Sequence, residues 1–392
     1  MLNEKLLALG KHRSEIRELF EYGKTLTSQG LPVCDLTLGN PSTQTPDWVT
    51  KALQDALSAN NVHAYTSAQG SQSARAVIAK CLNENHDAEA FDKDGIILTC
   101  GAAASLCGVI KALTASENDE IAVLSPYFPE YKVFIESAGA NFVSIPFVSD
   151  DFNVDLKSLD TLVNKNTKAI IINNPNNPSG KVYTKEEIEA IAKILSAKQD
   201  EYNHPIYVIS DEPYREIVFE GEKVTPIANL YKNTIICYSF SKSLSLPGER
   251  IGYIAIPNEI CLFSDLYAGF LGALRSVGYV CAPSIFQFVI ENLKPIFSDF
   301  SVYENNKNIL INGLTQLGFT CNNPKGAFYL MVKAPDGDAK DMSEKAKKLG
   351  LLVVPGNSFG ANGYVRLATC VSSQTATKAV ELFRLLAKEY NM

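Results

Sequence analysis

The chain has 392 residues, of which 46% are hydrophobic and 20% charged, a composition typical of globular proteins. Its length exceeds that of one ordinary hydrophobic core, so we expect two domains. The formal net charge of -7 disfavours a non-specific nucleic-acid surface or an anionic-membrane surface, and we expect neither partner.

Nine cysteines are scattered without a CxxC pair, and Cys237 and Cys281 lie in apolar runs, so we interpret them as free thiols in a reducing compartment. The N-terminus alternates charges with leucines, unlike a signal peptide, and no run approaches the roughly 18 apolar residues of a membrane span. We therefore predict a cytoplasmic protein. Four histidines without a zinc-binding spacing give no support for a metal site, and none is predicted.

The first predicted elements are a charged amphipathic helix over residues 1–30, ending at Gly30, and a short extended run over Val33–Leu38. That run leads into a glycine-proline loop, LGNPSTQTP. Helices are then expected over Trp48–Ala59 and Ser73–Leu82, with the turn-rich segment HAYTSAQGS between them.

Short apolar runs interleaved with helical stretches follow. They are predicted as strands at Ile96–Thr99, Ile121–Leu124, Phe142–Ile145, Ala169–Ile172, Ile206–Ile209, Thr234–Tyr238 and Ile251–Ile256. Because these runs are continuously apolar rather than alternating, they indicate strands buried on both faces, and hence an α/β fold with a mostly parallel central sheet sandwiched by helices. Thr184 and Glu187 form a capping-box signature for a helix that runs to about Gln199.

The pattern changes beyond Pro283. A long helical segment from Ser284 to about Gly318, with a break near Pro295, precedes an alternation of strands and helices. The predicted order is Gly326–Val332 (strand), Met342–Leu349 (helix), Leu351–Val354 and Tyr364–Ala368 (strands), and Ser373–Tyr390 (helix). We predict a smaller α+β domain from residues 1–45 and 284–392, beside a large domain of residues 46–283.

In an open parallel sheet, ligands bind beyond the carboxyl ends of the strands. Ile96–Thr99 is followed by CGAAAS, whose small residues can expose backbone amides to a phosphate at a helix start. Ile121–Leu124 is followed by SPYFPEY, which places Tyr127, Phe128 and Tyr131 on a loop where their faces could stack on a planar ring. Simple packing is the alternative for both segments.

Three further strand ends carry polar groups. NNPNNPSG after the fourth strand is a tight turn that leaves asparagine side chains as hydrogen-bond donors. SDEPY puts Asp211 at the end of a buried strand with Tyr214 three residues later, and a helix-capping aspartate is the alternative. SFSKS carries Lys242, for which an exposed surface lysine is the alternative. Partial burial and the like charge of Arg250 would lower the pKa of that ammonium and suit Schiff-base chemistry.

An amine nucleophile, a carboxylate, a phenol, an amide, a stacking ring and a phosphate cradle are the groups that pyridoxal phosphate requires. The order NPxNPxG, DxxY and SxSK, with an arginine eight residues after the lysine, resembles the class I/II aminotransferases of the fold-type I pyridoxal-phosphate family, from about Leu38 to Leu367. The resemblance implies an aspartate aminotransferase-like enzyme that moves an amino group between an L-amino acid and a 2-oxo acid, with the aspartate, alanine or aromatic type unresolved. A pyridoxal-phosphate-dependent β-eliminating C–S lyase shares these motifs and is the alternative.

The resemblance also implies roles around the cofactor ring. Lys242 would form the Schiff base and move the proton at the substrate Cα, and Asp211 would pair with the pyridine nitrogen, whose charge would lower the pKa of the carboxyl. Asn177 and Tyr214 would hydrogen-bond the phenolate oxygen, and Phe128 would stack on the ring.

Phosphate ligands are implied as well. They would be the backbone amides of Ala102 and Ala103, the side chains of Ser239 and Arg250, and Tyr65 from a neighbouring subunit, so a homodimer is expected. With the charge of Arg250 largely neutralised by phosphate, the lowered pKa of the lysine would come chiefly from its imine.

For the substrate, Arg366 in GYVRLA resembles the arginine that clamps the α-carboxylate, with Gly39 and Asn177 lining the same pocket. Gly39 and Tyr65 lie in short turn motifs, and a purely structural role is the alternative for each. In some aspartate-preferring relatives a lysine near the phosphate loop meets the distal carboxylate, but Ala103 stands there in this chain. Dicarboxylate specificity is therefore in doubt.

Overall fold

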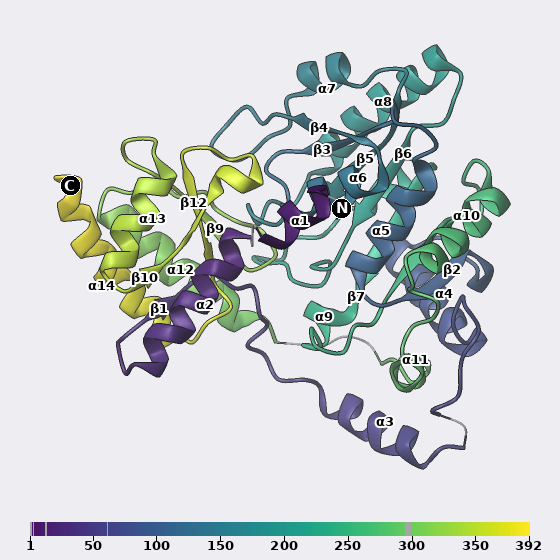
Figure 1. Cartoon of the computed structure of the whole chain (residues 1–392), viewed down its shortest axis with the longest axis horizontal. Coiled ribbons are helices and arrows are strands. Elements are labelled where there is room, and N and C mark those ends of the chain that lie inside the picture. Colours follow the sequence, from purple (N-terminus) through teal and green to yellow (C-terminus); the bar gives the residue numbers. More distant parts are fainter. Residues whose placement is uncertain (1, 3, 12–13, 61, 295–298) are drawn as a thin grey trace.

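A mostly parallel sheet forms the centre of the molecule. The computed structural model describes residues 2, 4–11, 14–60, 62–294 and 299–392. Within these ranges, seven strands form the central sheet in the order β2-β8-β7-β6-β5-β3-β4. Figure 1 shows this sheet beside a smaller group of elements coloured purple and yellow, which joins the two ends of the chain.

The strands of the central sheet lie within two residues of the predicted apolar runs. They are β2 (Ile96–Thr99), β3 (Glu120–Leu124), β4 (Asn141–Ile145), β5 (Thr167–Asn173), β6 (Tyr207–Asp211), β7 (Thr234–Ser239) and β8 (Gly252–Ala255). Neighbours from β4 to β7 are parallel, whereas β8 runs antiparallel to both β7 and β2. The predicted α/β class and the mostly parallel sheet are confirmed.

Helices cover both faces of the sheet, which explains the continuous apolar runs. In β3, Ile121 and Val123 belong to the core on one face, and Ala122 and Leu124 belong to the core on the other. The first face packs against α5 (Ala102–Leu113), α6 (Glu130–Ala138) and α10 (Phe263–Ser276). The second packs against α7 (Leu156–Leu162) and α8 (Lys185–Tyr202), and beyond them α3 (Asp47–Ser58), α4 (Gln72–His86) and α11 (Ser284–Glu291) pack on β2, β7 and β8. The predicted capping box is present at the start of α8.

A second hydrophobic core forms from the two ends of the chain. In the described residues, an antiparallel three-stranded sheet has the order β11 (Val354–Pro355), β12 (Tyr364–Ala368), β9 (Tyr329–Lys333), and β1 (Cys34–Asp35) pairs in parallel with β10 (Leu351–Leu352). Their core includes residues of α12 (Ser301–Gln316), α13 (Ala339–Lys348) and α14 (Ser373–Glu389). The single strand predicted over Leu351–Val354 is wrong, because the chain changes partners at Val353 and continues in a different sheet.

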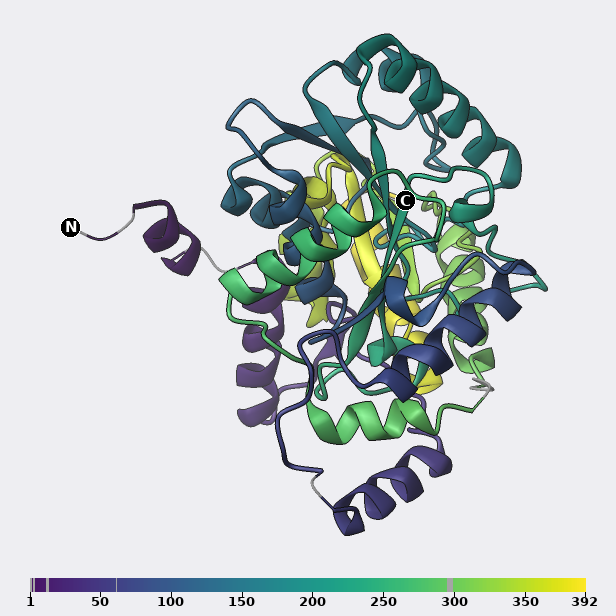
Figure 2. The ribbon, with the colours of Figure 1, turned by 90° about the vertical axis from the view of Figure 1, so that its right-hand side faces the viewer.

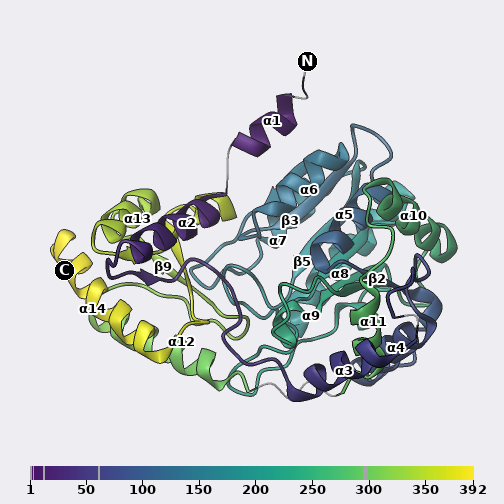
Figure 3. The same ribbon diagram turned by 60° about the horizontal axis from the view of Figure 1, so that its bottom comes forward.

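The N-terminal region contains α1 (Glu4–Lys11) and α2 (Glu15–Ser28), while residues 1, 3 and 12–13 of the predicted helix lie outside the described residues. None of the residues of α1 is buried, and Figures 2 and 3 show it projecting from the rest of the molecule. The break expected near Pro295 also lies outside the described residues. The domain boundaries at residues 46 and 283 stay predictions. No helix in the described part of the chain is long and apolar enough to cross a membrane.

Candidate active site

Asp211 is the last residue of β6, and its side chain is buried. One carboxylate oxygen, Oδ2, accepts hydrogen bonds from the Tyr131 hydroxyl and, at 3.4 Å, from Asn173 Nδ2. The other oxygen, Oδ1, is buried and has no hydrogen-bond partner among the described residues. Burial raises the pKa of Asp211 to about 7, although the hydrogen bond from Tyr131 acts in the opposite direction. The helix-capping alternative is wrong, because the carboxylate bonds to Tyr131 and Asn173 and not to a helix start.

Tyr131 differs from its prediction. It lies inside α6 rather than on a loop, is 1% exposed, and directs its hydroxyl at Asp211 instead of offering a stacking face. Phe128, just before α6, is half-buried and meets the Tyr131 ring edge-on at 5.6 Å between centroids. A tyrosine at the second position of a helix looks like core in the sequence, so nothing there pointed to this hydrogen bond.

The asparagine-rich turn after β5 links Asp211 to Arg366. Asn173 Nδ2 donates to the Asp211 carbonyl at 2.9 Å, and Asn173 Oδ1 accepts from the Asn177 amide at 2.6 Å. Asn177 Oδ1 in turn accepts from Arg366 Nη1 at 3.1 Å. The turn thus fixes a carboxylate and a guanidinium relative to each other.

Arg366 lies in the middle of β12 and is 1% exposed. Its guanidinium packs between the rings of Tyr329 and Phe359, at 4.5 and 4.8 Å from their centroids. Nη2 donates to the Thr37 carbonyl, whereas the buried Nε has no partner among the described residues. Burial lowers the pKa of this guanidinium, but an arginine side chain remains charged at neutral pH. A buried cation with a free donor is suited to an anionic ligand such as a carboxylate.

Lys242 lies in α9 (Phe240–Ser243), directly after β7, and its ammonium is not a free surface charge. Nζ donates to the Gly39 carbonyl at 2.7 Å and lies 5.6 Å from the Phe328 ring centroid. Burial lowers the pKa of Lys242 to about 8; Cys370 opposes this shift, and the cations Arg250 and Arg366 add to it. The surface-lysine alternative is therefore wrong. Burial alone already lowers the pKa of the free amine, and the further effect of an imine on this lysine stays a prediction.

Arg250 lies just before β8 in the left-handed backbone region, with a φ of 53°. Its Nη2 donates to the Cys100 carbonyl at 3.2 Å and its Nη1 to Ser241 Oγ at 3.5 Å. Ser241 Oγ lies 2.6 Å from Ser239 Oγ, so this hydroxyl, which the sequence analysis did not name, links the two predicted phosphate ligands.

The N-terminus of α5 faces the same group. It begins at Ala102 after Gly101, whose φ is 87°, and a Cβ on Gly101 would lie 2.7 Å from Arg250 Nη2. Ala102 is half-buried and Ala103 is exposed. The first amides of a helix lack intrahelical acceptors and favour an anion, so the helix start and Arg250 together form a cradle suited to a phosphate.

Tyr214 and Gly39 meet at Tyr329, a residue that the sequence motifs did not mark. Tyr214 is buried, with its hydroxyl 3.2 Å from the Tyr329 hydroxyl. A Cβ on Gly39 would lie 1.8 Å from the same oxygen, so the close approach of the backbone requires glycine.

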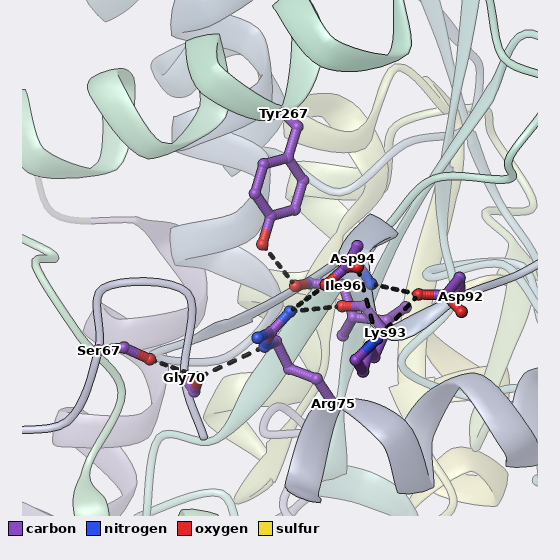
Figure 4. Close-up of polar contacts among 8 residues, drawn as sticks. All are labelled: Ser67, Gly70, Arg75, Asp92, Lys93, Asp94, Ile96 and Tyr267. Carbon is purple, nitrogen blue, oxygen red and sulfur yellow. Dashed lines mark hydrogen bonds and ion pairs between the residues drawn. The ribbon is translucent and has the colours of Figure 1, made fainter. Parts of the chain in front are cut away.

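Tyr65 is the predicted site residue that the structure does not bring to the others, since its side chain is 99% exposed. The loop that follows it is held firmly. Arg75 of α4 donates to the carbonyls of Gly70 and Lys93, at 3.3 and 2.7 Å, and Ser67 Oγ donates to the Gly70 carbonyl (Figure 4).

Gln287 of α11 holds the same loop from the other side. This buried side chain donates to Thr66 Oγ1 and accepts from the Ser71 amide, both at 2.8 Å. An exposed ring on an anchored loop fits a residue presented to another subunit.

The contacts of these residues fit the chemical groups of pyridoxal phosphate. Asp211 Oδ1 is a buried carboxylate oxygen that lacks a partner among the described residues, as a protonated pyridine nitrogen would need. The cradle at Ala102 and Arg250 suits the phosphate, and Lys242 supplies an amine with a lowered pKa.

Comparison with known proteins identifies the family. A profile of the family "Aminotransferase class I and II" matches residues 32–383. The chain belongs to this family. The probable aspartate aminotransferase of Methanocaldococcus jannaschii is 30% identical to it over 379 residues, which cover 95% of this chain and 96% of the relative.

Solved structures agree. An aminotransferase from Eubacterium rectale is 44% identical and superimposes with a TM-score of 0.97 over 100% of both chains. The aspartate aminotransferase of Thermus thermophilus with maleate is 27% identical, with a TM-score of 0.88 over 98% of this chain and 99% of that one. The protein is thus a pyridoxal-phosphate-dependent aminotransferase that acts on amino acids and 2-oxo acids, as predicted.

Proposed function

We propose that this aminotransferase carries out reversible transamination at the site formed by Lys242, Asp211 and Arg366. The observation that carries the proposal is the buried Asp211 Oδ1, which lacks a partner among the described residues although the protein binds the other oxygen of the same carboxylate twice. A carboxylate arranged in this way is suited to hold one further N–H donor.

The proposed cofactor ligands surround that carboxylate. Asp211 would bind the pyridine nitrogen, and Tyr214 and Asn177 would hydrogen-bond the phenolate oxygen. Phe128 would stack on the ring. The phosphate would be held by the amides of Ala102 and Ala103 and by the side chains listed here: Ser239, Arg250 and, from a second subunit, Tyr65. The link between Ser239 and Arg250 through Ser241 supports a shared ligand for these two.

Bound pyridoxal phosphate supplies an electrophilic carbonyl and a ring that withdraws electrons from the bonds at the substrate Cα. Lys242 Nζ would hold the cofactor, and its free amine would take the proton from the substrate Cα. A pKa of about 8 leaves about a tenth of this amine unprotonated at pH 7, far more than for an ordinary lysine with a pKa of about 10.4. The Asp211 carboxylate would hold the proton at the pyridine nitrogen, although burial raises the pKa of its own carboxyl.

Substrate binding would rest on Arg366, whose free Nε and planar guanidinium suit the α-carboxylate. Asn177 orients that guanidinium, and Gly39 keeps the pocket open beside Tyr329. Ala103 brings no cation for a distal carboxylate, so we propose that aromatic and small neutral amino acids compete well with aspartate.

We further propose a homodimer in a reducing, cytoplasmic compartment. The 99% exposed Tyr65 on its anchored loop supports the dimer. The nine cysteines, all within the described residues, are free thiols and support the compartment.

The test is a half-reaction screen. The holoenzyme is mixed separately with L-aspartate, L-alanine, L-phenylalanine and other amino acids, and the visible absorbance of the bound cofactor is followed. Loss of that absorbance with release of the matching 2-oxo acid is expected. Release of pyruvate from S-substituted cysteines, without loss of absorbance by any amino acid, would instead identify a β-eliminating lyase.

A further inference from the structure

A single backbone segment, residues 37–45, crosses the site between Arg366 and Lys242, and we call it the Gly39 strap. At one end the Thr37 carbonyl accepts from Arg366 Nη2, and the Leu38 carbonyl accepts from Cys370 Sγ at 3.6 Å. In the middle the Gly39 carbonyl accepts from Lys242 Nζ at 2.7 Å. The strap therefore touches both the substrate arginine and the reactive lysine.

A buried tyrosine from α12 holds the far end of the strap. Tyr303 is 0% exposed, and its Oη accepts from the Ser42 and Thr43 amides at 3.0 and 3.2 Å. Two accepted hydrogen bonds occupy both lone pairs of the phenol oxygen, so its own proton is left for Thr43 Oγ1 at 3.2 Å. Thr43 Oγ1 can then donate to Ser245 Oγ, 2.7 Å away. The result is a directed chain of hydroxyl groups.

The chain ends three residues after Lys242. Ser245 has a φ of 53°, a left-handed backbone that is unfavourable for an L-residue and persists only where the surroundings fix it. Thr45 Oγ1 adds a hydrogen bond to the Ser245 carbonyl at 3.3 Å. The strap and the lysine loop are thus tied together at Gly39, which accepts directly from Lys242, and at Ser245, which is bound through both the hydroxyl chain and Thr45.

We propose that Tyr303, Thr43 and Ser245 are positioning residues for transamination, which hold the Gly39 carbonyl where it orients the Lys242 amine. The inference rests on the proposed function and adds residues that lie outside its cofactor and substrate ligands. With one hydrogen fixed by the Gly39 carbonyl, the amine keeps a defined direction when it takes the proton from the substrate Cα. Misplacement of a reacting atom by about 1 Å can slow a reaction by as much as about 100-fold.

The main variant is Tyr303→Phe, and its matched control is Tyr231→Phe. Tyr231 is also a buried tyrosine, but its hydroxyl donates at 2.6 Å to the Ile206 carbonyl in the core beneath α8. Each substitution removes one buried hydroxyl group with its hydrogen bonds, so both variants should be less stable than wild type. Thr43→Val is the second variant, since it removes a half-exposed hydroxyl without a change of shape.

The first readout is hydrogen exchange of the holoenzyme, which does not depend on turnover. Loss of the Tyr303 acceptor should accelerate exchange of the Ser42 and Thr43 amides by about tenfold, the size expected for a lost hydrogen bond. Tyr231→Phe should leave these amides unchanged.

The second readout is turnover of L-alanine, L-aspartate and L-phenylalanine, each with hydrogen or deuterium at Cα, scored on the fastest donor. We expect Tyr303→Phe to lower kcat by about tenfold and to raise the isotope effect on kcat, because proton transfer becomes more rate-limiting. Thr43→Val should act in the same direction. The loss of kcat in the double variant should be smaller than the product of the two single losses, since both substitutions act through the strap.

An unchanged isotope effect in both Tyr303→Phe and Thr43→Val, or effects equal to those of Tyr231→Phe, would overturn the proposal. Failure of the wild-type enzyme to release a 2-oxo acid from any donor would instead overturn the proposed function, so the two outcomes are distinct.

Discussion

Replacing Asp211 by asparagine should make the cofactor-free protein more stable while it impairs the enzyme. The buried carboxyl has a pKa of about 7 in the folded protein and about 3.9 in the unfolded chain. The folded state therefore binds the proton more tightly, and its stability falls as pH rises from about 3.9 to about 7. A difference of about three units corresponds to about 4 kcal/mol at full ionisation.

Asparagine keeps the shape of the side chain but does not ionise. Its amide, placed where Oδ1 lies, would lack an acceptor among the described residues and costs about 1–3 kcal/mol at every pH. The absolute gain is thus smaller than the ionisation energy. This constant cost does not change the pH dependence. The free energy of unfolding of Asp211→Asn, relative to that of wild type, should therefore rise by about 3 kcal/mol from pH 5 to pH 8.

The assay is urea unfolding of the two apoenzymes at both pH values. Asp119→Asn is the control, because its effect should not depend on pH in this range. Asp119 is also buried, but amide hydrogen bonds from Ala115 and Ser116, at 2.7 and 2.8 Å, outweigh burial and hold its pKa below the usual range. Its contribution to stability is already complete at pH 5 and is lost only as pH falls below about 3.9, so Asp119→Asn should destabilise the protein by the same amount at pH 5 and pH 8.

An Asp211→Asn apoenzyme whose stability relative to wild type is the same at pH 5 and pH 8 would refute the assignment of a raised pKa. In the holoenzyme the same variant should lower kcat by about 10²- to 10³-fold, because a buried charged hydrogen bond to the ring nitrogen is lost.

Two further predictions concern Lys242 with Tyr65, and Arg366. Lys242→Ala should retain bound cofactor but lose nearly all turnover, and Tyr65→Ala should bind the cofactor phosphate weakly. When the two variants are mixed and exchange subunits, activity should return, because one of the two sites in each hybrid dimer has both Lys242 and Tyr65. Absence of recovery in a verified hybrid would contradict the contribution of Tyr65 across the interface. Arg366→Lys should raise the KM of amino and 2-oxo acids by about 10- to 100-fold, the cost of a lost charged hydrogen bond, with a smaller change in kcat. Equal KM values in wild type and Arg366→Lys would exclude Arg366 as the carboxylate ligand.

The sequence was informative where chemistry lies next to a strand end. Asp211 and Lys242 directly follow apolar runs, so the rule for parallel sheets predicted that they would share one edge of the sheet, and the structure places them there. The asparagine turn was also visible, since repeated Asn-Pro steps are rare in plain loops. Such patterns can be interpreted from the sequence because the conformation that they specify depends on neighbouring residues in the chain.

Residues whose role depends on distant contacts could not be predicted. Tyr131, Tyr303 and Tyr329 are aromatic residues in helices or strands, where their type and spacing look like core. Their hydroxyl groups matter because folding brings them to Asp211, the Gly39 strap and Tyr214. Tyr231 is also a buried tyrosine, and only the contacts of the folded chain distinguish it from these three residues.

The pairing of distant strands also has a consequence for the order of folding. Edge strand β2 pairs Ile96 with Ala255 of β8, and β1 pairs Cys34 with Leu351 of β10. During synthesis, β1 must therefore wait until most of the chain has left the ribosome. Gly39 lies four residues after β1, so this late pairing helps to fix its carbonyl beside Lys242. The lysine loop and the phosphate cradle come from earlier parts of the chain, which makes closure of the strap one of the last events in the formation of the active site.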